Sequence, residues 1–296
     1  PFNCTYCFNH IYHSIYRNKG KLTRTKSVGY LINEIKDTLT KFPVSFVKFY
    51  DDIFGSDREW LTEFAGRYPK EIGLPYLCFA RLNLIDDEYC RLMKKSGCFT
   101  VITAIECGNE TVRNNVLNRN MTDEQIISGF EKLKKYGIRT YSVNMLGLPG
   151  ETEKELLQTL HINQKVKTDF ADASIFQPFP GTRLAGYCKQ NGYVDNDFND
   201  FQSIFSRSVL NFEQSFKDKV YITHKVFSFL VSHPRLNYLL KVFYIMGRIP
   251  YFKNLFNLFY RSYYGVAVYR KIYGCRIPIG LCLRGAFSLL FSRSRI

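Results

Sequence analysis

Two cysteines near the start of the chain, Cys4 and Cys7, have the clearest chemical potential of all its residues. A CxxC pair can bind zinc, exchange disulfides, or supply two thiolates of an iron–sulfur cluster. His10 and His13 follow in a C-x2-C-x2-H-x2-H pattern, so a zinc site stays open, although no second segment supplies ligands. Thiol exchange is less favoured, because no helix of a short βαβ unit begins at Cys4. A cluster needs another thiolate, which we expect immediately before Pro1.

Polar residues follow each of five apolar runs that have the composition of β-strands. The runs cover residues 44–50, 76–80, 99–105, 139–146 and 171–176. Where parallel strands form a barrel, the chemistry lies at their carboxyl ends. The sequence therefore predicts a polar binding rim made of Tyr50, Asp51 and Asp52, Arg81, Glu106, Gly147 to Glu151, and Gln177.

Helix signals alternate with these runs. Asp86 is a predicted N-cap, and Thr122 with Gln125 and Thr152 with Glu155 are predicted capping boxes. Strand and helix alternation predicts a parallel sheet covered by helices. We expect an α/β fold, a partial (β/α)6 TIM-like barrel with a C-terminal helical extension, whose first strand would precede Pro1.

The charge of the chain is concentrated at its C-terminal end. The formal net charge is +15, and residues 217–296 carry 14 Lys and Arg against one acidic residue. Residues 1–216 have 27 basic and 25 acidic groups and are nearly neutral. This asymmetry predicts a catalytic core at 1–193, a polar connector at 194–216, and a basic, aromatic-rich helical region at 217–296.

The basic region contains 17 aromatic residues, and Pro234, Pro250 and Pro278 are expected to divide it into helices. It has no charge-free run long enough to cross a bilayer. One interpretation is that its aromatic residues pack on the core while its charges face solvent. The functional interpretation we prefer is binding to anionic lipid or a lipid-linked phosphate; nucleic acid ranks below both.

Six segments of the chain have the form of sequence motifs: PFNCTYC, VKFYDDIF, TAIECGNE, VLNRNMTDEQ, MLGLPGET and FQPFPGTRLAGYCKQNGY. Together they resemble the radical S-adenosylmethionine (radical SAM) enzymes over residues 1–193. The first looks like the end of the C-x3-C-x-aromatic-C cluster loop, and the others resemble the strand-two, strand-four, helix-start, strand-five and strand-six motifs. GLPGET and PFPGT particularly resemble the branch whose members often carry a cobalamin-binding domain.

The resemblance implies that Cys4 and Cys7 bind a [4Fe-4S] cluster, with the third cysteine just ahead of Pro1. S-adenosylmethionine would occupy the open iron, and its reductive cleavage would give a 5′-deoxyadenosyl radical that attacks an unactivated carbon. An electron donor such as flavodoxin or ferredoxin is implied as a partner.

The resemblance also assigns roles around the SAM molecule. Tyr6 would lie near the adenine, and Asp51 or Asp52 would accept hydrogen bonds from the methionyl ammonium group. Glu106 would accept from the ribose hydroxyls, and Arg119 would pair with the SAM carboxylate. The residues implied to shape the adenine pocket are Asn144, Gly147 and Gln177.

The substrate is not specified. Methylation is the foremost expectation if a cobalamin domain exists upstream. Residues 1–296 contain no D-x-H-x-x-G loop for a cobalamin lower ligand, so we expect any such domain ahead of Pro1. The alternatives are radical SAM modification of RNA or a peptide without cobalamin, and a non-catalytic zinc- or nucleic-acid-binding module. Nine cysteines without the spacing of a disulfide framework indicate a reducing, cytoplasmic compartment. If the basic region binds anionic lipid, we expect the protein to be peripheral to the inner face of the membrane.

Overall fold

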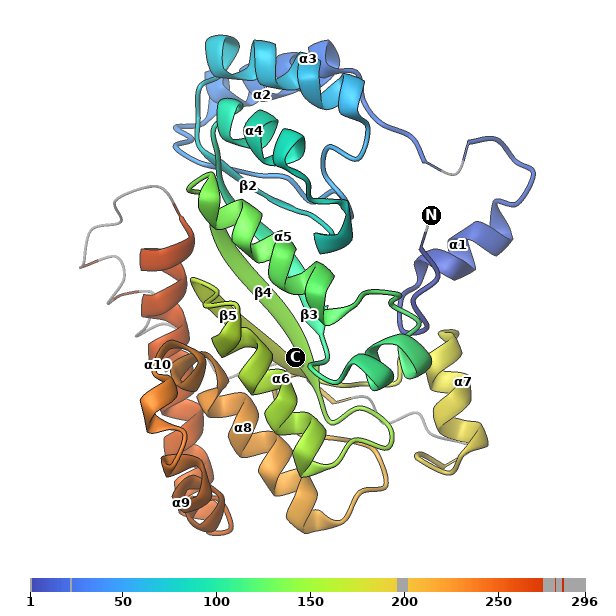
Figure 1. Cartoon of the computed structure of the whole chain (residues 1–296), viewed down its shortest axis with the longest axis vertical. Helices are drawn as coiled ribbons and strands as arrows, with labels where there is room; N and C mark the ends of the chain where they lie inside the picture. The colour runs from blue at the N-terminus through green and yellow to red at the C-terminus, as the bar shows by residue number, and fades with distance from the viewer. Residues whose placement is uncertain (1, 22, 196–201, 274–279, 281–283, 285–296) are drawn as a thin grey trace.

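The computed structural model describes residues 2–21, 23–195 and 202–273, together with 280 and 284. Its centre is a parallel sheet whose five strands pair in chain order, as in half of a β/α barrel (Figure 1). All five predicted strands are present, and only the first is much shorter than predicted. The strands are β1 (Val47–Lys48), β2 (Tyr76–Phe79), β3 (Cys98–Glu106), β4 (Arg139–Leu146) and β5 (Phe170–Ile175).

Five helices, arranged in chain order, cover one face of the sheet. Asp86 accepts a hydrogen bond from the backbone N–H of Tyr89, and both predicted capping boxes are formed. These caps fix where the helices begin, and buried apolar side chains on their inner faces join the strand residues in one core. The five helices are α2 (Val28–Lys41), α3 (Arg58–Glu71), α4 (Asp87–Lys95), α5 (Asp123–Lys135) and α6 (Glu153–Lys165).

Two shorter helices lie on the same side of the molecule in Figure 1. They are α1 (Asn9–Ile15), just after the cysteine pair and ahead of β1, and α7 (Arg183–Gln190), which follows β5. Two single turns, η1 (Leu82–Leu84) and η2 (Val112–Val116), follow β2 and β3. Residues 4–7, called the cysteine loop below, are hydrogen-bonded to Leu117, after β3, and to Leu184 of α7. The cysteine loop therefore lies at the rim where barrel chemistry is expected.

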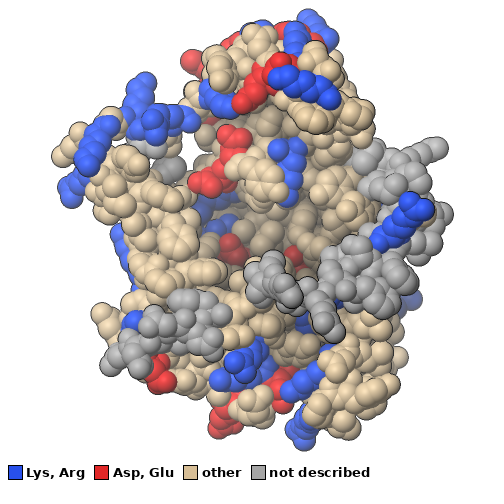
Figure 2. Space-filling model, turned by 180° about the vertical axis from the view of Figure 1, so that it is seen from behind, with Lys and Arg blue, Asp and Glu red and all other residues tan. Residues whose placement is uncertain are grey.

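The view from behind shows a molecule that is hollowed near the centre of that face (Figure 2). Both acidic and basic side chains are visible in and around the hollow, among a larger number of uncharged residues (Figure 2). The helices drawn in front of the sheet in Figure 1 therefore cover one side, and the other side presents a concave surface that contains charged groups.

The predicted helical extension is present and closes the β5 side of the sheet. It consists of α8 (Gln214–Ser232), the turn η3 (Pro234–Leu236), α9 (Leu239–Met246) and α10 (Pro250–Ile272). Val226 of α8 packs in the cluster that contains Ala173 of β5, and Arg139 of β4 donates to the carbonyl of Lys271 at 2.6 Å. The basic region thus buries part of its apolar surface against the core.

The described part of the extension bears on several sequence expectations. Pro234 and Pro250 each begin a helix, whereas Pro278 and residues 196–201 of the connector lie outside the described residues. No helix among the described residues is both long enough and apolar enough to cross a membrane. The division into core, connector and basic region stays a prediction.

Candidate functional site

The cysteine loop is tied to two other segments by hydrogen bonds of Thr5. Thr5 donates from its N–H to the carbonyl of Leu117 at 3.0 Å and from Oγ1 to the carbonyl of Val116 at 2.7 Å. Its own carbonyl accepts from the N–H of Leu184, at the start of α7, at 2.9 Å. Cys4 is buried and Cys7 is half-buried. The loop is therefore positioned by the η2 turn on one side and by α7 on the other.

Tyr6 joins two residues that the resemblance assigned to SAM. Its hydroxyl donates to Oε1 of Glu106 at 3.0 Å and accepts from Nη1 of Arg119 at 2.7 Å. The guanidinium of Arg119 also donates to the carbonyl of Ala104. Glu106 and Arg119 are themselves 3.9 Å apart, and both are largely buried. The structure thus brings together residues from the cysteine loop, the end of β3 and the loop before α5.

Burial sets the electrostatics of this group. Burial raises the pKa of Glu106, although the nearby Arg119 and the hydrogen bond from Tyr6 oppose that increase. Burial likewise raises the pKa of Tyr6 well above its ordinary value and raises the pKa of the Cys7 thiol. The group is a low-dielectric site in which charge pairing and hydrogen bonding are strong.

The backbone at Glu106 is unusual. Its φ angle is 69°, which is uncommon for a residue with a side chain, and the register of β3 against β4 shifts between Ala104 and Glu106. Strained backbone of this kind is concentrated at functional sites. Two residues later Gly108 packs against α6 so tightly that an added Cβ would lie 2.2 Å from the carbonyl oxygen of Gln158. The Glu-x-Gly pattern therefore combines a strained carboxylate position with a close contact that only glycine permits.

The two aspartates after β1 differ in their contacts. Oδ2 of Asp52 accepts a hydrogen bond at 2.8 Å from Nδ2 of Asn9, which lies two residues after Cys7. Asp51 is exposed, and within the described part of the chain it has no such bond to the cysteine loop. Of the two candidates, Asp52 is therefore the one that the structure connects to the loop.

Arg81 is a site residue to which sequence reasoning assigned no role beyond its place on the rim. Its Nη1 lies 3.7 Å from Sγ of Cys4, which is 77 positions earlier in the chain, and its Nη2 donates to the carbonyl of Arg119. The only sequence signal for Arg81 is that it follows the strand β2.

The three residues expected at the adenine make other contacts. Asn144 is fully buried, and its amide pairs with Asn163 of α6, because its side chain projects from the helix-covered face of β4. Gly147 has a φ angle of 75°, and its N–H donates to the carboxylate of Glu151. Gln177 donates to the carbonyl of Arg207 at 3.0 Å. The structure does not join these three to the Tyr6 group, and their role at the adenine stays a prediction.

The zinc alternative requires Cys4, Cys7, His10 and His13 to converge. Among the described residues, no three or more His, Cys, Asp or Glu side chains are grouped as ligands for one metal ion. The structure therefore does not assemble the four-residue set that the spacing suggested.

Comparisons with known proteins agree with this geometry. Residues 1–162 match the family model of the radical SAM superfamily. An uncharacterized methyltransferase of Pyrococcus horikoshii is 27% identical over 195 residues, which are 66% of this chain and 41% of that protein. The cytidylyl-2-hydroxyethylphosphonate methyltransferase of Streptomyces wedmorensis is 23% identical over 220 residues, covering 71% of this chain and 39% of that protein.

A solved structure shares the fold. The radical SAM methyltransferase TsrM of Kitasatospora setae, with cobalamin and a [4Fe-4S] cluster bound, aligns with a TM-score of 0.54 and 16% identity. The alignment covers 66% of this chain and 39% of TsrM. The chain thus spans about two fifths of the length of the curated relatives above. Because the family model covers more than half of its residues, the chain belongs to the radical SAM superfamily.

Proposed function

We propose that this chain is the core of a radical SAM enzyme that binds a [4Fe-4S] cluster through Cys4 and Cys7. The family pattern puts the third thiolate at the position before Pro1. SAM would lie across Glu106, Arg119 and Asp52. The finer proposal is methylation of an unactivated carbon in an anionic or lipid-linked substrate, with cobalamin bound by another part of the protein.

The observation that carries the proposal is the pair of hydrogen bonds at the Tyr6 hydroxyl. Tyr6 immediately precedes Cys7, and it contacts both the carboxylate of Glu106 and the guanidinium of Arg119. A carboxylate and a planar cation at one end of the cysteine loop match the ribose hydroxyls and the carboxylate of SAM. The proposal therefore rests on three motifs that meet in space.

The side chains present fit an anionic cluster and a zwitterionic ligand. Nε of Arg119 is buried and has no hydrogen-bond partner in the described part of the chain, so it has a donor available for a ligand. Arg81 and Arg119 supply two positive charges beside Cys4, where a thiolate-bound cluster would place negative charge.

In this proposal the protein residues position SAM and shield it from water. When bound, the cluster supplies the electron that cleaves SAM to the 5′-deoxyadenosyl radical. Tyr6 keeps the carboxylate of Glu106 in place, and the buried surroundings of Glu106 and Arg119 exclude water that would weaken their contacts. Asp52, which accepts a hydrogen bond from Asn9, would accept from the ammonium group of SAM.

Methyl transfer is supported by the names of the similar proteins. The relatives from Pyrococcus and Streptomyces are both called methyltransferases, and TsrM is a methyltransferase with cobalamin bound. Liquid chromatography with mass spectrometry should find both 5′-deoxyadenosine and S-adenosylhomocysteine after turnover of the full-length protein with SAM, cobalamin, dithionite as the electron source and a lipid-linked phosphate as the substrate. Formation of 5′-deoxyadenosine alone would contradict methyl transfer and leave the radical SAM assignment intact.

The cluster is tested by iron and sulfide analysis of full-length protein prepared without oxygen. We expect about four iron and four sulfide per chain, lost in Cys4→Ala and Cys7→Ala. Cys188→Ala is the matched control, since Cys188 is a buried free thiol in α7 and should leave the iron content unchanged. Stoichiometric zinc without sulfide would contradict the proposal.

We also propose that the exposed surface of α9 and α10 contacts an anionic membrane. From Lys219 onward the chain has no Asp or Glu. Exposed apolar side chains follow one another at helical spacing along α9 and into α10, and the exposed Lys241 and Arg248 lie among them. Mixed apolar and basic surfaces of this kind bind the headgroup region of anionic bilayers. The apolar members are Tyr238, Val242, Ile245, Ile249, Tyr251, Leu255 and Leu258.

Sedimentation with phosphatidylglycerol vesicles tests this surface. Ile245 is 64% exposed. Ile245→Glu should reduce binding, because it replaces an apolar side chain by a negative charge that the anionic bilayer repels. Tyr30→Glu is the matched control, since Tyr30 on α2 is 60% exposed and lies outside the surface. Equal binding of both variants, or no binding of the wild-type protein, would contradict membrane contact.

A further inference from the structure

Arg81 is a buried cation whose hydrogen-bond partners are neutral groups or a thiol. It lies just after β2 and is 6% exposed. Its Nε donates to Oδ1 of Asn83 at 2.9 Å, its Nη2 to the carbonyl of Arg119, and its Nη1 to Sγ of Cys4 at 3.7 Å. The guanidinium also lies over the ring of Phe2, with 3.9 Å between the guanidinium carbon and the ring centroid.

The surroundings of Arg81 differ from those of another buried arginine. Arg113 is fully buried and pairs with two carboxylates, those of Asp123 and Glu110. Among the described residues, no carboxylate forms an ion pair with Arg81, and its charged neighbour is the like-charged Arg119. A buried charge without a counter-charge is strongly unfavourable. A bound anion beside Arg81 would supply this missing counter-charge.

The geometry identifies where that anion lies. The guanidinium of Arg81 is held by Asn83, by the carbonyl of Arg119 and by the ring of Phe2. Its Nη1 points to the sulfur of Cys4. In a cluster-bound protein that sulfur is a thiolate of a group with net negative charge. Hydrogen bonds to cluster sulfurs are among the features that set reduction potential, since they stabilise the more negative, reduced state.

We propose that Arg81 is a positioning residue that donates a hydrogen bond to the cluster-bound sulfur of Cys4 and raises the reduction potential of the cluster. This inference rests on the proposed function. It explains why the chain buries an arginine at this point without an acidic partner. It also predicts that Arg81→Lys only partly preserves this role, because an ammonium group lacks the planar fork that contacts Asn83, Cys4 and Phe2 together.

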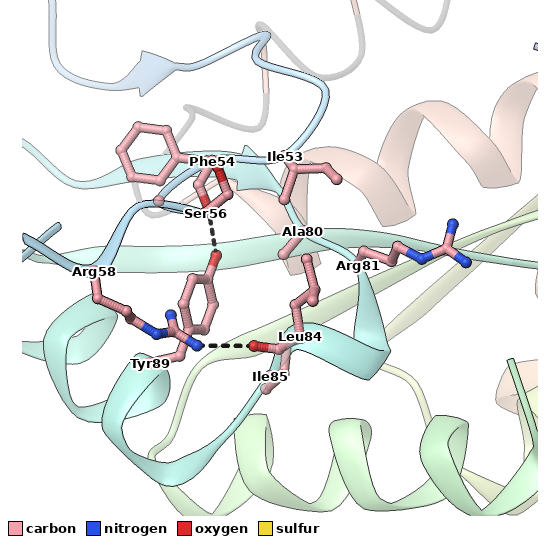
Figure 3. Close-up of a pocket in the computed structure, with 10 residues that line it drawn as sticks. Ile53, Phe54, Ser56, Arg58, Ala80, Arg81, Leu84, Ile85 and Tyr89 are labelled. Carbon is pink, nitrogen blue, oxygen red and sulfur yellow. Dashed lines mark hydrogen bonds between the residues drawn. The ribbon is translucent and has the colours of Figure 1, made fainter. Parts of the chain in front are cut away.

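A second arginine in the same region offers a matched control. Arg58 and Arg81 line the same cavity of about 60 Å³, but in Figure 3 Arg81 extends away from the side where Arg58 lies. Arg58 donates to the carbonyl of Leu84 at 3.0 Å and pairs with Asp86 at 2.9 Å. Arg58→Gln removes the same unit of charge from the same region without removing a donor to Cys4.

Potentiometric titration of the full-length, cluster-loaded protein, followed by electron paramagnetic resonance in the absence of SAM, tests the inference. In Arg81→Gln we expect the reduced-to-oxidised ratio at a fixed potential to fall about tenfold, equivalent to a shift of about 59 mV in the negative direction for a one-electron couple. Arg81→Lys should give a smaller shift in the same direction, and Arg58→Gln should match the wild-type protein.

A second measurement, thermal unfolding, establishes whether the Arg81→Gln variant folds. The thermal unfolding midpoint of cluster-free Arg81→Gln should equal or exceed that of the wild type, because the substitution removes an unpaired buried charge. Loading the cluster should raise the midpoint more in the wild type than in the variant. A lower cluster-free midpoint in the variant would contradict the unpaired-charge argument.

Two outcomes separate this inference from the proposed function. A wild-type protein that binds no iron and sulfide overturns both. A wild-type protein that loads the cluster while Arg81→Gln keeps the same SAM-free potential overturns only the role of Arg81. Weaker SAM binding in Arg81→Gln with an unchanged potential would assign Arg81 to the SAM carboxylate instead, and that outcome also overturns the inference.

Discussion

The hydroxyl of Tyr6 donates to Oε1 of Glu106 at 3.0 Å, although the two residues are 100 positions apart in the chain. The same hydroxyl accepts from Arg119 at 2.7 Å, so one oxygen atom holds a cation and an anion that are 3.9 Å from each other. This contact joins the cysteine loop to the end of β3. We infer that it fixes the orientation of the Glu106 carboxylate, the group that we propose accepts from the ribose hydroxyls of SAM.

Tyr6→Phe should lower the free energy of unfolding by about 1–3 kcal/mol, because it leaves a buried carboxylate oxygen and a buried guanidinium N–H without their partner. Urea titration followed by circular dichroism measures the change. Tyr12→Phe is the control, since Tyr12 on α1 is 58% exposed and should change stability by less than about 0.5 kcal/mol. Equal stability of both variants would mean that the hydrogen bonds of Tyr6 make no net contribution to the free energy of unfolding.

Asp52→Asn should weaken SAM binding to the cluster-loaded protein by about tenfold or more, because it would remove the charge-assisted hydrogen bond that we propose Asp52 accepts from the ammonium group. Asp51→Asn should have little effect, since it is Asp52 that accepts a hydrogen bond from Asn9, two residues after Cys7. Equilibrium dialysis with labelled SAM measures both. A larger effect at Asp51 would reverse the assignment of the two aspartates.

The local elements of the fold could be predicted from the sequence, because their signals lie within a few residues. The capping box of Thr122 and Gln125 is one example: the helix begins where the pair predicts. Long-range contacts have no such local signal. Nothing near Arg81 in the sequence indicates that Cys4, 77 positions away, lies beside it.

Asn144 shows a second limit of sequence reasoning. The family resemblance implies that Asn144 helps to shape the adenine pocket, and that role stays a prediction. What the sequence did not indicate is which face of β4 carries its side chain, because side chains alternate between the two faces of a strand. Asn144 is on the face covered by α6, where its amide and that of Asn163 form a buried hydrogen bond at 2.8 Å. The alternation along β4 does not say which face the helices cover, so the sequence could not place Asn144 against Asn163, 19 positions away.

Gly108→Ala should reduce stability by about 1–3 kcal/mol, because the new methyl group would overlap the backbone of α6. An ideal Cβ at Gly108 would lie 2.2 Å from the carbonyl oxygen of Gln158, and a backbone atom cannot rotate away. Chemical denaturation measures the loss. At Gly186, inside α7, a Cβ would meet nothing within 4 Å, so Gly186→Ala should instead stabilise the protein by about 0.5–1 kcal/mol. A Gly108→Ala protein as stable as the wild type would disprove the close contact.

Glu151 should make stability depend on pH. Burial raises its pKa from 4.5 to about 8, against the opposing hydrogen bonds from the N–H groups of Gly147 and Leu148. A carboxyl group with a raised folded-state pKa binds more protons in the folded than in the unfolded chain between these two values. Its contribution to stability is therefore complete below pH 4.5 and is lost as the pH rises toward 8, with a slope of at most about 1.4 kcal/mol per pH unit.

Comparing Glu151→Gln with the wild type across this range isolates the effect, because other buried groups titrate equally in both proteins. The stability of the wild type relative to the variant should fall between pH 5 and 8 and level off above it. Glu155→Gln gives the opposite pattern: hydrogen bonding to Thr152 lowers the pKa of Glu155, so its contribution is lost only as the pH falls below 4.5. A difference between wild type and Glu151→Gln that stays constant from pH 5 to 8 would mean that Glu151 titrates normally, and the loop from Gly147 to Glu151 would then have to admit water.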